Sequence, residues 1–130
     1  MSHFSTVKTQ LRQREPLFQA LIDLGYVPQD GKNYVRGYKG QTVQADLAVT
    51  MSKGSDIGFR LNKSTNTYEL VTDIDLWKET VPIDRFLSQL TQRYAFNAVV
   101  SASAEEGFQI AEQKKNLDGS IELVVTRWDT

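Results

Sequence analysis

The sequence predicts an α+β fold: a single, mainly antiparallel sheet of about six to seven strands, with two helices packed on one face. Apolar residues recur at helical spacing in two segments and alternate with polar residues in several others. The expected order is strand, helix, four strands, helix, two strands, which contains too few helical crossovers for a doubly wound parallel sheet. We expect one domain over residues 1–130.

The N-terminal part is expected to form a short strand and then a helix. Residues 3–7 are rich in β-forming types, which indicates the strand. Apolar residues in the segment 13–24 form one stripe at helical spacing, and Pro16 is tolerated there because it falls in the first turn. Gly25 supplies the left-handed residue with which helices commonly end.

Two hairpins are expected next, because the apolar pattern changes from helical spacing to alternation. Each pair of strands is separated by a polar or glycine-containing loop, and residues 53–56 form the turn between the two hairpins. The four strands are expected at residues 33–38, 41–51, 57–61 and 68–72.

A second helix and a third hairpin complete the predicted fold. Val81 and Pro82 open the helix, since proline costs little at the first helical position, and Asp84 lies favourably near the positive end of the helix dipole. The apolar stripe continues to residue 106, as one long helix or as two with a break near Asn97, and Gly107 ends it. The last strands are expected at residues 108–113 and 121–126, around a turn at residues 116–119.

Charge and composition exclude several classes of protein. The formal net charge is −1, so the basic bias of a protein that binds nucleic-acid backbones is missing. Apolar runs are only a few residues long, against the roughly 20 needed to cross a bilayer. The N-terminus lacks the pattern of a secretory signal and the chain has no cysteine, so we expect a small soluble protein of a reducing, cytoplasmic compartment.

Side chains that carry chemistry near neutral pH are scarce, since the chain has no cysteine and a single histidine, His3. No glycine-rich phosphate loop and no Gly-x-Ser-x-Gly motif occurs. We therefore expect no cofactor, no metal and no catalytic residue. The alternative is a small metal-dependent enzyme or cofactor handler, in which His3 acts with Asp73 and Asp75, two carboxylates that an extended chain projects to one side.

The candidate interaction surface consists of aromatic and arginine side chains. Tyr34, Arg36 and Tyr38 alternate along one predicted strand and so share a face, and Trp77 follows the two aspartates. Such residues dominate the binding energy of protein interfaces when they are exposed. The same face could stack on single-stranded nucleic acid, which is a second alternative, but a basic surround is missing.

Signatures at the two ends of the chain are typical of one family. Their residues are Ser2, His3, Phe4, Ser5, Lys8, Thr9, Ala20, Leu21, Asp23, Leu24 and Gly25, then Gly107, Phe108, Asp118, Gly119, Ser120, Ile121, Arg127 and Trp128. The chain resembles the hypothetical chloroplast reading frame thirty-five family, a domain of unknown function in cyanobacteria and some algal plastids.

That resemblance implies a cyanobacterial cytosol or a plastid stroma as the setting. It supplies no activity, cofactor or catalytic residue. Relatives in other bacteria and phages lie beside AAA-type ATPases, which implies a subunit or adaptor that works with such an ATPase. The function expected from the sequence is therefore that of a non-enzymatic binding or adaptor protein with a protein partner.

Overall fold

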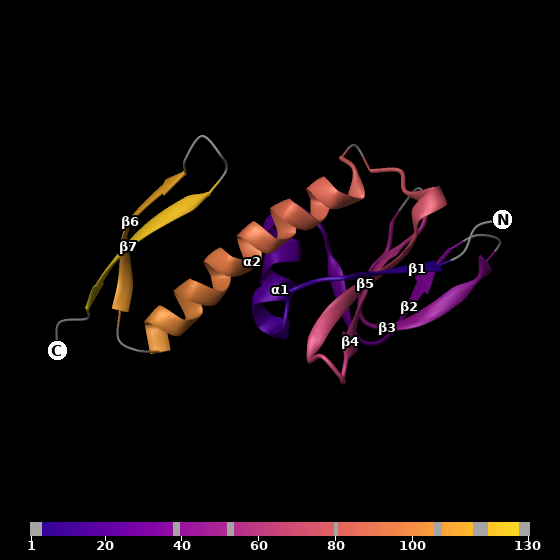
Figure 1. The fold of residues 1–130 in the computed structure, drawn as a ribbon, viewed down its shortest axis with the longest axis horizontal. Coiled ribbons are helices and arrows are strands. Elements are labelled where there is room, and N and C mark those ends of the chain that lie inside the picture. Colours follow the sequence, from indigo (N-terminus) through magenta and orange to yellow (C-terminus); the bar gives the residue numbers. More distant parts are fainter. Residues whose placement is uncertain are drawn as a thin grey trace.

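A five-stranded antiparallel sheet and two helices form the body of the protein in the computed structural model, which describes residues 4–37, 40–51, 54–79, 81–105, 108–115 and 120–127 (Figure 1). The spatial order of the strands is β1-β5-β4-β3-β2, so the first strand pairs with the fifth. The strands are β1 (Phe4–Lys8), β2 (Pro28–Arg36), β3 (Thr42–Val49), β4 (Ile57–Asn62) and β5 (Thr67–Asp73).

Both predicted helices are present. The first, α1 (Arg14–Asp23), is followed by Gly25 at a φ of 94°, the left-handed conformation expected of it. The second, α2 (Ile83–Glu105), is one continuous helix of 23 residues without a break at Asn97, which settles a point that the sequence left open. Gly107, the expected end of this helix, lies outside the described residues.

The main core lies between the helices and one face of the sheet, which confirms that both helices pack on the same face. Phe59 on the central strand β4 is fully buried and belongs to the same cluster as side chains from both helices. The buried members of this core are Leu11, Leu17, Ala20, Leu21, Leu47, Val49, Ile57, Phe59, Tyr68, Leu70, Phe86 and Leu90.

A second, smaller core lies on the other side of β4. Val35 of β2 and Ala45 of β3 pack directly over Gly58. A Cβ atom built on Gly58 would overlap Val35 Cγ2 and lie 3.0 Å from Ala45 Cβ. Glycine at this position therefore lets the hairpin approach the sheet.

The predicted single sheet is wrong in one respect, because the seven strands form two sheets. Strands β6 (Phe108–Lys115) and β7 (Ile121–Arg127) pair with each other in a separate antiparallel sheet. A helix rises about 1.5 Å per residue, so the 23-residue α2 carries the chain away from the main sheet before β6 begins (Figure 1). No helix among the described residues has the length and apolar character needed for a membrane span.

Candidate functional site

Two residues of the predicted interaction surface lie together on the outer face of β2. Tyr34 and Arg36 are exposed and flank Val35, which points inward to the second core. Tyr34 is 59% exposed, so its ring is accessible to a partner. Tyr38, the third residue predicted for this face, lies outside the described residues.

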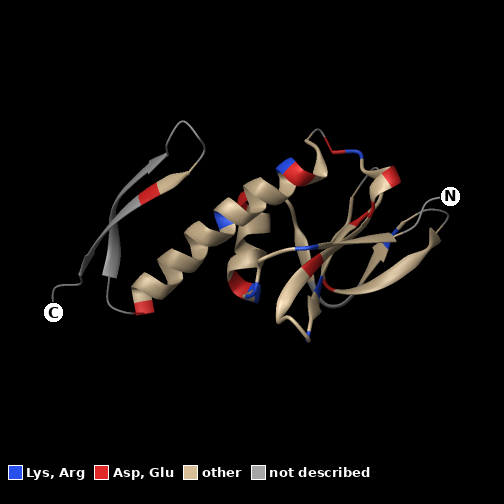
Figure 2. Ribbon diagram, viewed as in Figure 1, with Lys and Arg blue, Asp and Glu red and all other residues tan. Residues whose placement is uncertain are grey.

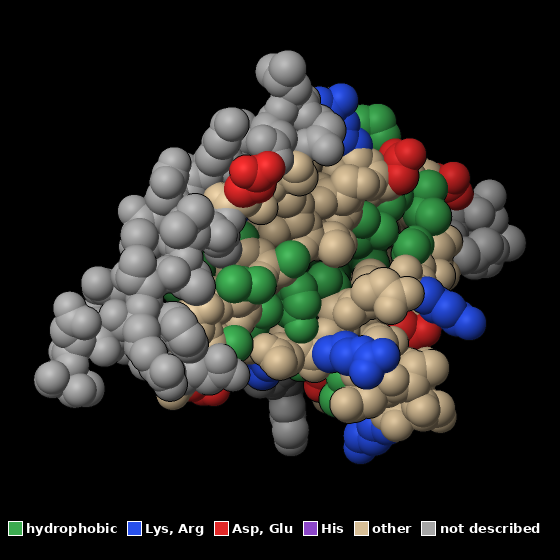
Figure 3. Space-filling model, turned by 60° about the vertical axis from the view of Figure 1, so that its left-hand side comes forward, with side chains coloured by type: hydrophobic (Ala, Val, Ile, Leu, Met, Phe, Trp, Pro, Cys, Tyr) green, Lys and Arg blue, Asp and Glu red, His purple; other side chains and the backbone are tan. Residues whose placement is uncertain are grey.

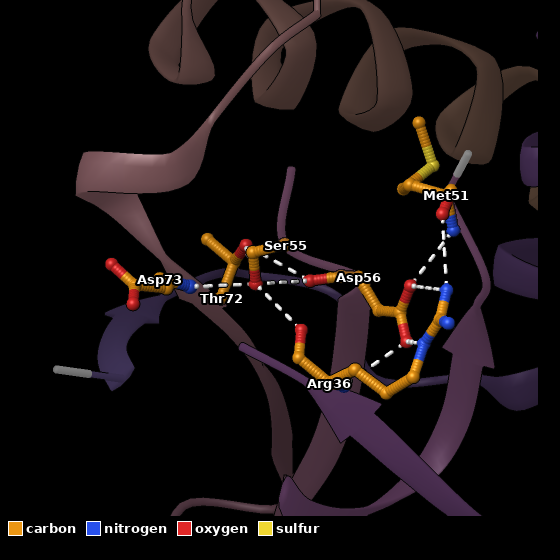
Figure 4. A network of polar contacts seen from close by, with 6 residues as sticks. All are labelled: Arg36, Met51, Ser55, Asp56, Thr72 and Asp73. Carbon is orange, nitrogen blue, oxygen red and sulfur yellow. Dashed lines mark hydrogen bonds and ion pairs between the residues drawn. The ribbon is translucent and has the colours of Figure 1, made fainter. Parts of the chain in front are cut away.

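Arg36 is held in place by the buried carboxylate of Asp56. The Arg36 Nε atom donates to Asp56 Oδ2 at 2.7 Å and Nη2 donates to Oδ1 at 3.0 Å, so the ion pair is bidentate (Figure 4). Nη2 also donates to the carbonyl oxygen of Met51 at 3.0 Å. The side chain of Arg36 is nevertheless 57% exposed, whereas that of Asp56 is 1% exposed.

Asp56 also closes one end of the edge strand β2. Its carboxylate accepts the backbone N–H groups of Arg36 and Met51, at 3.0 and 2.8 Å. The backbone N–H of Asp56 donates in turn to the carbonyl oxygen of Arg36 at 2.9 Å. The outward-facing backbone groups of Arg36 thus have partners although β2 is an edge strand, which protects this end against the addition of another strand.

A second set of hydrogen bonds fixes the loop before β4 onto β5. The Ser55 hydroxyl accepts the backbone N–H of Asp73 at 3.1 Å and donates to the carbonyl oxygen of Arg36 at 3.1 Å. The hydroxyl of Thr72 donates to the carbonyl oxygen of Asp56 at 3.0 Å. Because these groups are buried, the network holds Asp56, and through it Arg36, in one position (Figure 4).

The pKa of Asp56 is lower than that of a free aspartate. Burial raises it, but the hydrogen bonds from the Arg36 side chain and the two backbone N–H groups, with the positive charge of Arg36, outweigh burial. The pKa of Asp23 is also lowered: burial raises it, and hydrogen bonds from Arg93, Gln19 and Asn97 more than compensate. Asp23 accepts from Arg93 Nε at 2.8 Å and so connects α1 to α2.

Stability is expected to fall with acidification below about pH 5. A carboxyl whose folded-state pKa lies below the unfolded value of about 3.9 stabilises the fold at higher pH, and this contribution is lost as pH falls through the folded-state pKa. Urea unfolding between pH 6 and pH 3 should show this decline, and Asp56→Asn and Asp23→Asn should each make it shallower. Equal slopes in wild type and both variants would contradict the assignment.

Trp77 lies at the rim of the main core rather than on an open face. Its ring packs edge-on against Phe86, with ring centroids 5.4 Å apart, and its Nε1–H donates to the carbonyl oxygen of Val81 at 2.8 Å. The indole therefore anchors the segment between β5 and α2. No described contact brings it to Tyr34 or Arg36.

The predicted pair of aspartates is arranged differently from the extended chain that suggested it. The chain turns into the short 3-10 helix η2 (Ile74–Leu76) directly after β5. The buried Asp73 caps this helix, its Oδ1 accepting the N–H of Asp75 at 3.2 Å, while Asp75 is exposed. His3 lies outside the described residues, and within the described chain no group of three or more potential metal ligands occurs.

Sequence reasoning missed Ser55 and Asp56, which it assigned only to a turn. Their role depends on Arg36, some twenty residues earlier in the chain, and on Thr72 and Asp73, so no local pattern reveals it.

Positive and negative side chains are interspersed along the described ribbon (Figure 2). The described ribbon thus carries no uninterrupted run of basic residues of the kind expected for a protein that follows a nucleic-acid backbone.

Comparison with known proteins places the chain in a family. The model of the family described as protein of unknown function (DUF1257) matches residues 20–124. Among similar curated proteins are the uncharacterized proteins ycf35 of Guillardia theta (36% identical, 98% of each chain covered), Cyanophora paradoxa (34%, 98% of each) and Pyropia yezoensis (33%, 99% of each). No solved structure matches the chain significantly. The resemblance inferred from the two end signatures is therefore confirmed, and the chain belongs to the ycf35 family of uncharacterised proteins, with its DUF1257 domain.

Proposed function

We propose that this protein is a non-enzymatic binding or adaptor protein that engages a protein partner through the outer face of β2. The observation that supports this best is the pair formed by an exposed Tyr34 and an exposed Arg36 held rigidly by Asp56. Residues two apart on a strand lie on the same side, about 6–7 Å from each other. We call this pair the Tyr34–Arg36 surface.

The fixed position of Arg36 favours binding. An arginine side chain that moves freely in the unbound protein loses rotamer freedom when a partner immobilises it. That loss of entropy opposes association. The bidentate bond to Asp56 and the bond to Met51 already restrict the guanidinium before any partner arrives. The remaining exposed part of the side chain can stack or donate without that cost.

The proposal for the setting and for the class of partner rests on the family resemblance. We place the protein in the cyanobacterial cytosol or plastid stroma, as the family resemblance implies. The same resemblance implies an AAA-type ATPase as the partner class to examine first.

Tagged protein produced at its native level in a photosynthetic host is expected to co-purify with a stoichiometric protein partner, and Tyr34→Ala is expected to abolish that recovery. Truncation of a tyrosine that is a binding hot spot weakens binding by about 2 kcal/mol or more, roughly thirtyfold. Val27→Ala is the matched control, since Val27 is an apolar residue that is 79% exposed at another place.

Circular dichroism and thermal melts should be the same for both variants and wild type, because neither side chain belongs to a core. Loss of the partner from both variants, or from neither, contradicts the assignment of the binding surface. Absence of any stoichiometric partner contradicts the proposed function itself.

A further inference from the structure

A groove runs along the side of α2 that is turned away from α1. It has a volume of about 820 Å³, within the usual range for ligand sites. One wall is the end of β1 and the residues after it, and the other is the first half of α2. Its lining residues are Lys8, Thr9, Gln10, Arg85, Leu87, Ser88, Gln89, Thr91, Gln92 and Ser120.

The two walls run side by side in the same direction. The backbone N–H groups of Arg12 and Gln13 both donate to the hydroxyl of Tyr94 on α2, at 3.1 and 2.8 Å. These bonds fix the end of the first wall near the middle of α2, and Figure 1 shows β1 and α2 running in the same general direction across the view. Lys8 consequently lies toward the same end of the groove as Arg85.

The two charged side chains that line this groove in the described part of the chain are positive. Among the described residues that line it, Lys8 and Arg85 are charged and none is an aspartate or glutamate, and neither cation has an ion pair within the described part of the chain. Glu69 lies opposite Lys8 in the β1–β5 ladder but lines a neighbouring hollow. The remaining lining is mostly hydroxyl and amide groups, which can bond to a peptide backbone.

The groove continues into an apolar hollow at its other end. Gln92 and Ser120 line both spaces, and the hollow adds Ala95, Phe96 and Val99 of α2 and Ile121 of β7. Val99 is 45% exposed. Figure 3 shows apolar side chains gathered in a band across the middle of one face of the molecule, with both positively and negatively charged side chains along its right-hand side.

We propose that this groove binds an extended segment of about six residues from a partner protein. Its acidic residues lie at the end near Lys8 and Arg85, and its large apolar residues lie at the end near Phe96 and Val99. The distance along α2 from Arg85 to Val99 is about 21 Å at 1.5 Å per residue. Six extended residues span about 20 Å. The inference does not rest on the Tyr34–Arg36 surface, because the two share no residue.

The test uses three labelled hexapeptides with blocked ends. The first has three acidic residues followed by three large apolar residues, the second replaces the acidic residues by lysine, and the third is apolar throughout its first half and acidic in its second. Fluorescence anisotropy gives the affinities, and shifts of backbone amide resonances in the ¹⁵N-labelled full chain give the site.

One of the two acidic peptides should shift the amides of Thr9, Gln10, Ser88 and Gln92, and the lysine peptide should not. The two acidic peptides differ only in direction, so the tighter one gives the orientation of the segment. Lys8→Glu combined with Arg85→Glu should weaken binding at least about tenfold, because two attractions become repulsions. Lys63→Glu, an exposed lysine outside the groove, is the matched control and should leave the affinity unchanged.

Several results would overturn the inference. They are shifts confined to residues outside the groove, equal affinity for the lysine peptide, and insensitivity to the double charge reversal. Binding of a single-stranded oligonucleotide at the same amides with higher affinity than either acidic peptide would assign the groove to nucleic acid instead. Since Tyr34→Ala does not alter the groove, failure here is separable from failure of the Tyr34–Arg36 surface.

Discussion

Asp56→Ala is expected to lower the free energy of unfolding by about 3 kcal/mol, since it removes the acceptor of two backbone and two side-chain donors at once. The N–H groups of Arg36 and Met51 are left without their partner, and each such loss costs about 1–3 kcal/mol when the group stays away from water. Urea unfolding followed by circular dichroism measures the change. Asp75→Ala, which removes an exposed carboxylate, should cost less than about 0.5 kcal/mol.

The companion variant Arg36→Met separates the ion pair from the backbone bonds. The methionine keeps an apolar stem, and Asp56 keeps its two backbone donors. Because the Arg36 side chain is 57% exposed, water can enter the space that the guanidinium leaves. We expect a cost clearly smaller than that of Asp56→Ala, because the pair is partly open to water. A cost larger than that of Asp56→Ala would show that the ion pair, rather than the closure of the β2 edge, carries the stability.

Gly58→Ala is expected to destabilise the protein by about 2–3 kcal/mol, although it adds a single methyl group. The new Cβ atom would overlap Val35 Cγ2 and lie 3.0 Å from Ala45 Cβ, so the β2–β3 hairpin has to move away from β4. Adding atoms to a filled core typically costs 1–3 kcal/mol. The β-branched Val35 has little rotamer freedom with which to avoid the clash. Thermal and urea unfolding measure the effect.

Val35→Ala is expected to rescue Gly58→Ala in part. Alone it leaves a cavity under the hairpin and destabilises the protein. In the double variant the methyl group of residue 58 occupies space that Val35 vacated, so the combined loss should be smaller than the sum of the single losses by at least about 1 kcal/mol. Strict additivity would mean that the two side chains do not compete for one space, contrary to the packing of the second core.

The elements were largely predictable because their signals are local. The helices, the β4–β5 hairpin and the last hairpin follow from spacing, proline and glycine within a few residues of one another. The start of β2 was not predictable in this way: residues 28–32 contain Pro28 and Gly31, which favour a turn, and pairing with residues 47–49 of β3 outweighs that preference.

Features that depend on distant partners could not be predicted. The alternation of β1 does not reveal that β5, rather than β2, is its neighbour, and nothing in β6 or β7 excludes the main sheet. Tyr34 and Arg36 were placed on one face from their spacing alone, but the buried carboxylate that fixes Arg36 lies in a segment with the composition of an ordinary turn. The shared face of Tyr34 and Arg36 could therefore be predicted from strand periodicity. The polar network around Asp56 could not, because its members are far apart in the sequence.

The small C-terminal sheet has a consequence for how the molecule fluctuates. A lone pair of strands is marginally stable in water, so β6 and β7 depend on their contacts with α2 and form a unit that can open without the rest of the fold. Ser120, directly before β7, borders the groove that Lys8 and Arg85 also border. We therefore expect an occupant of that groove to hold the hairpin against α2, so that slower amide hydrogen exchange in β7 reports its binding.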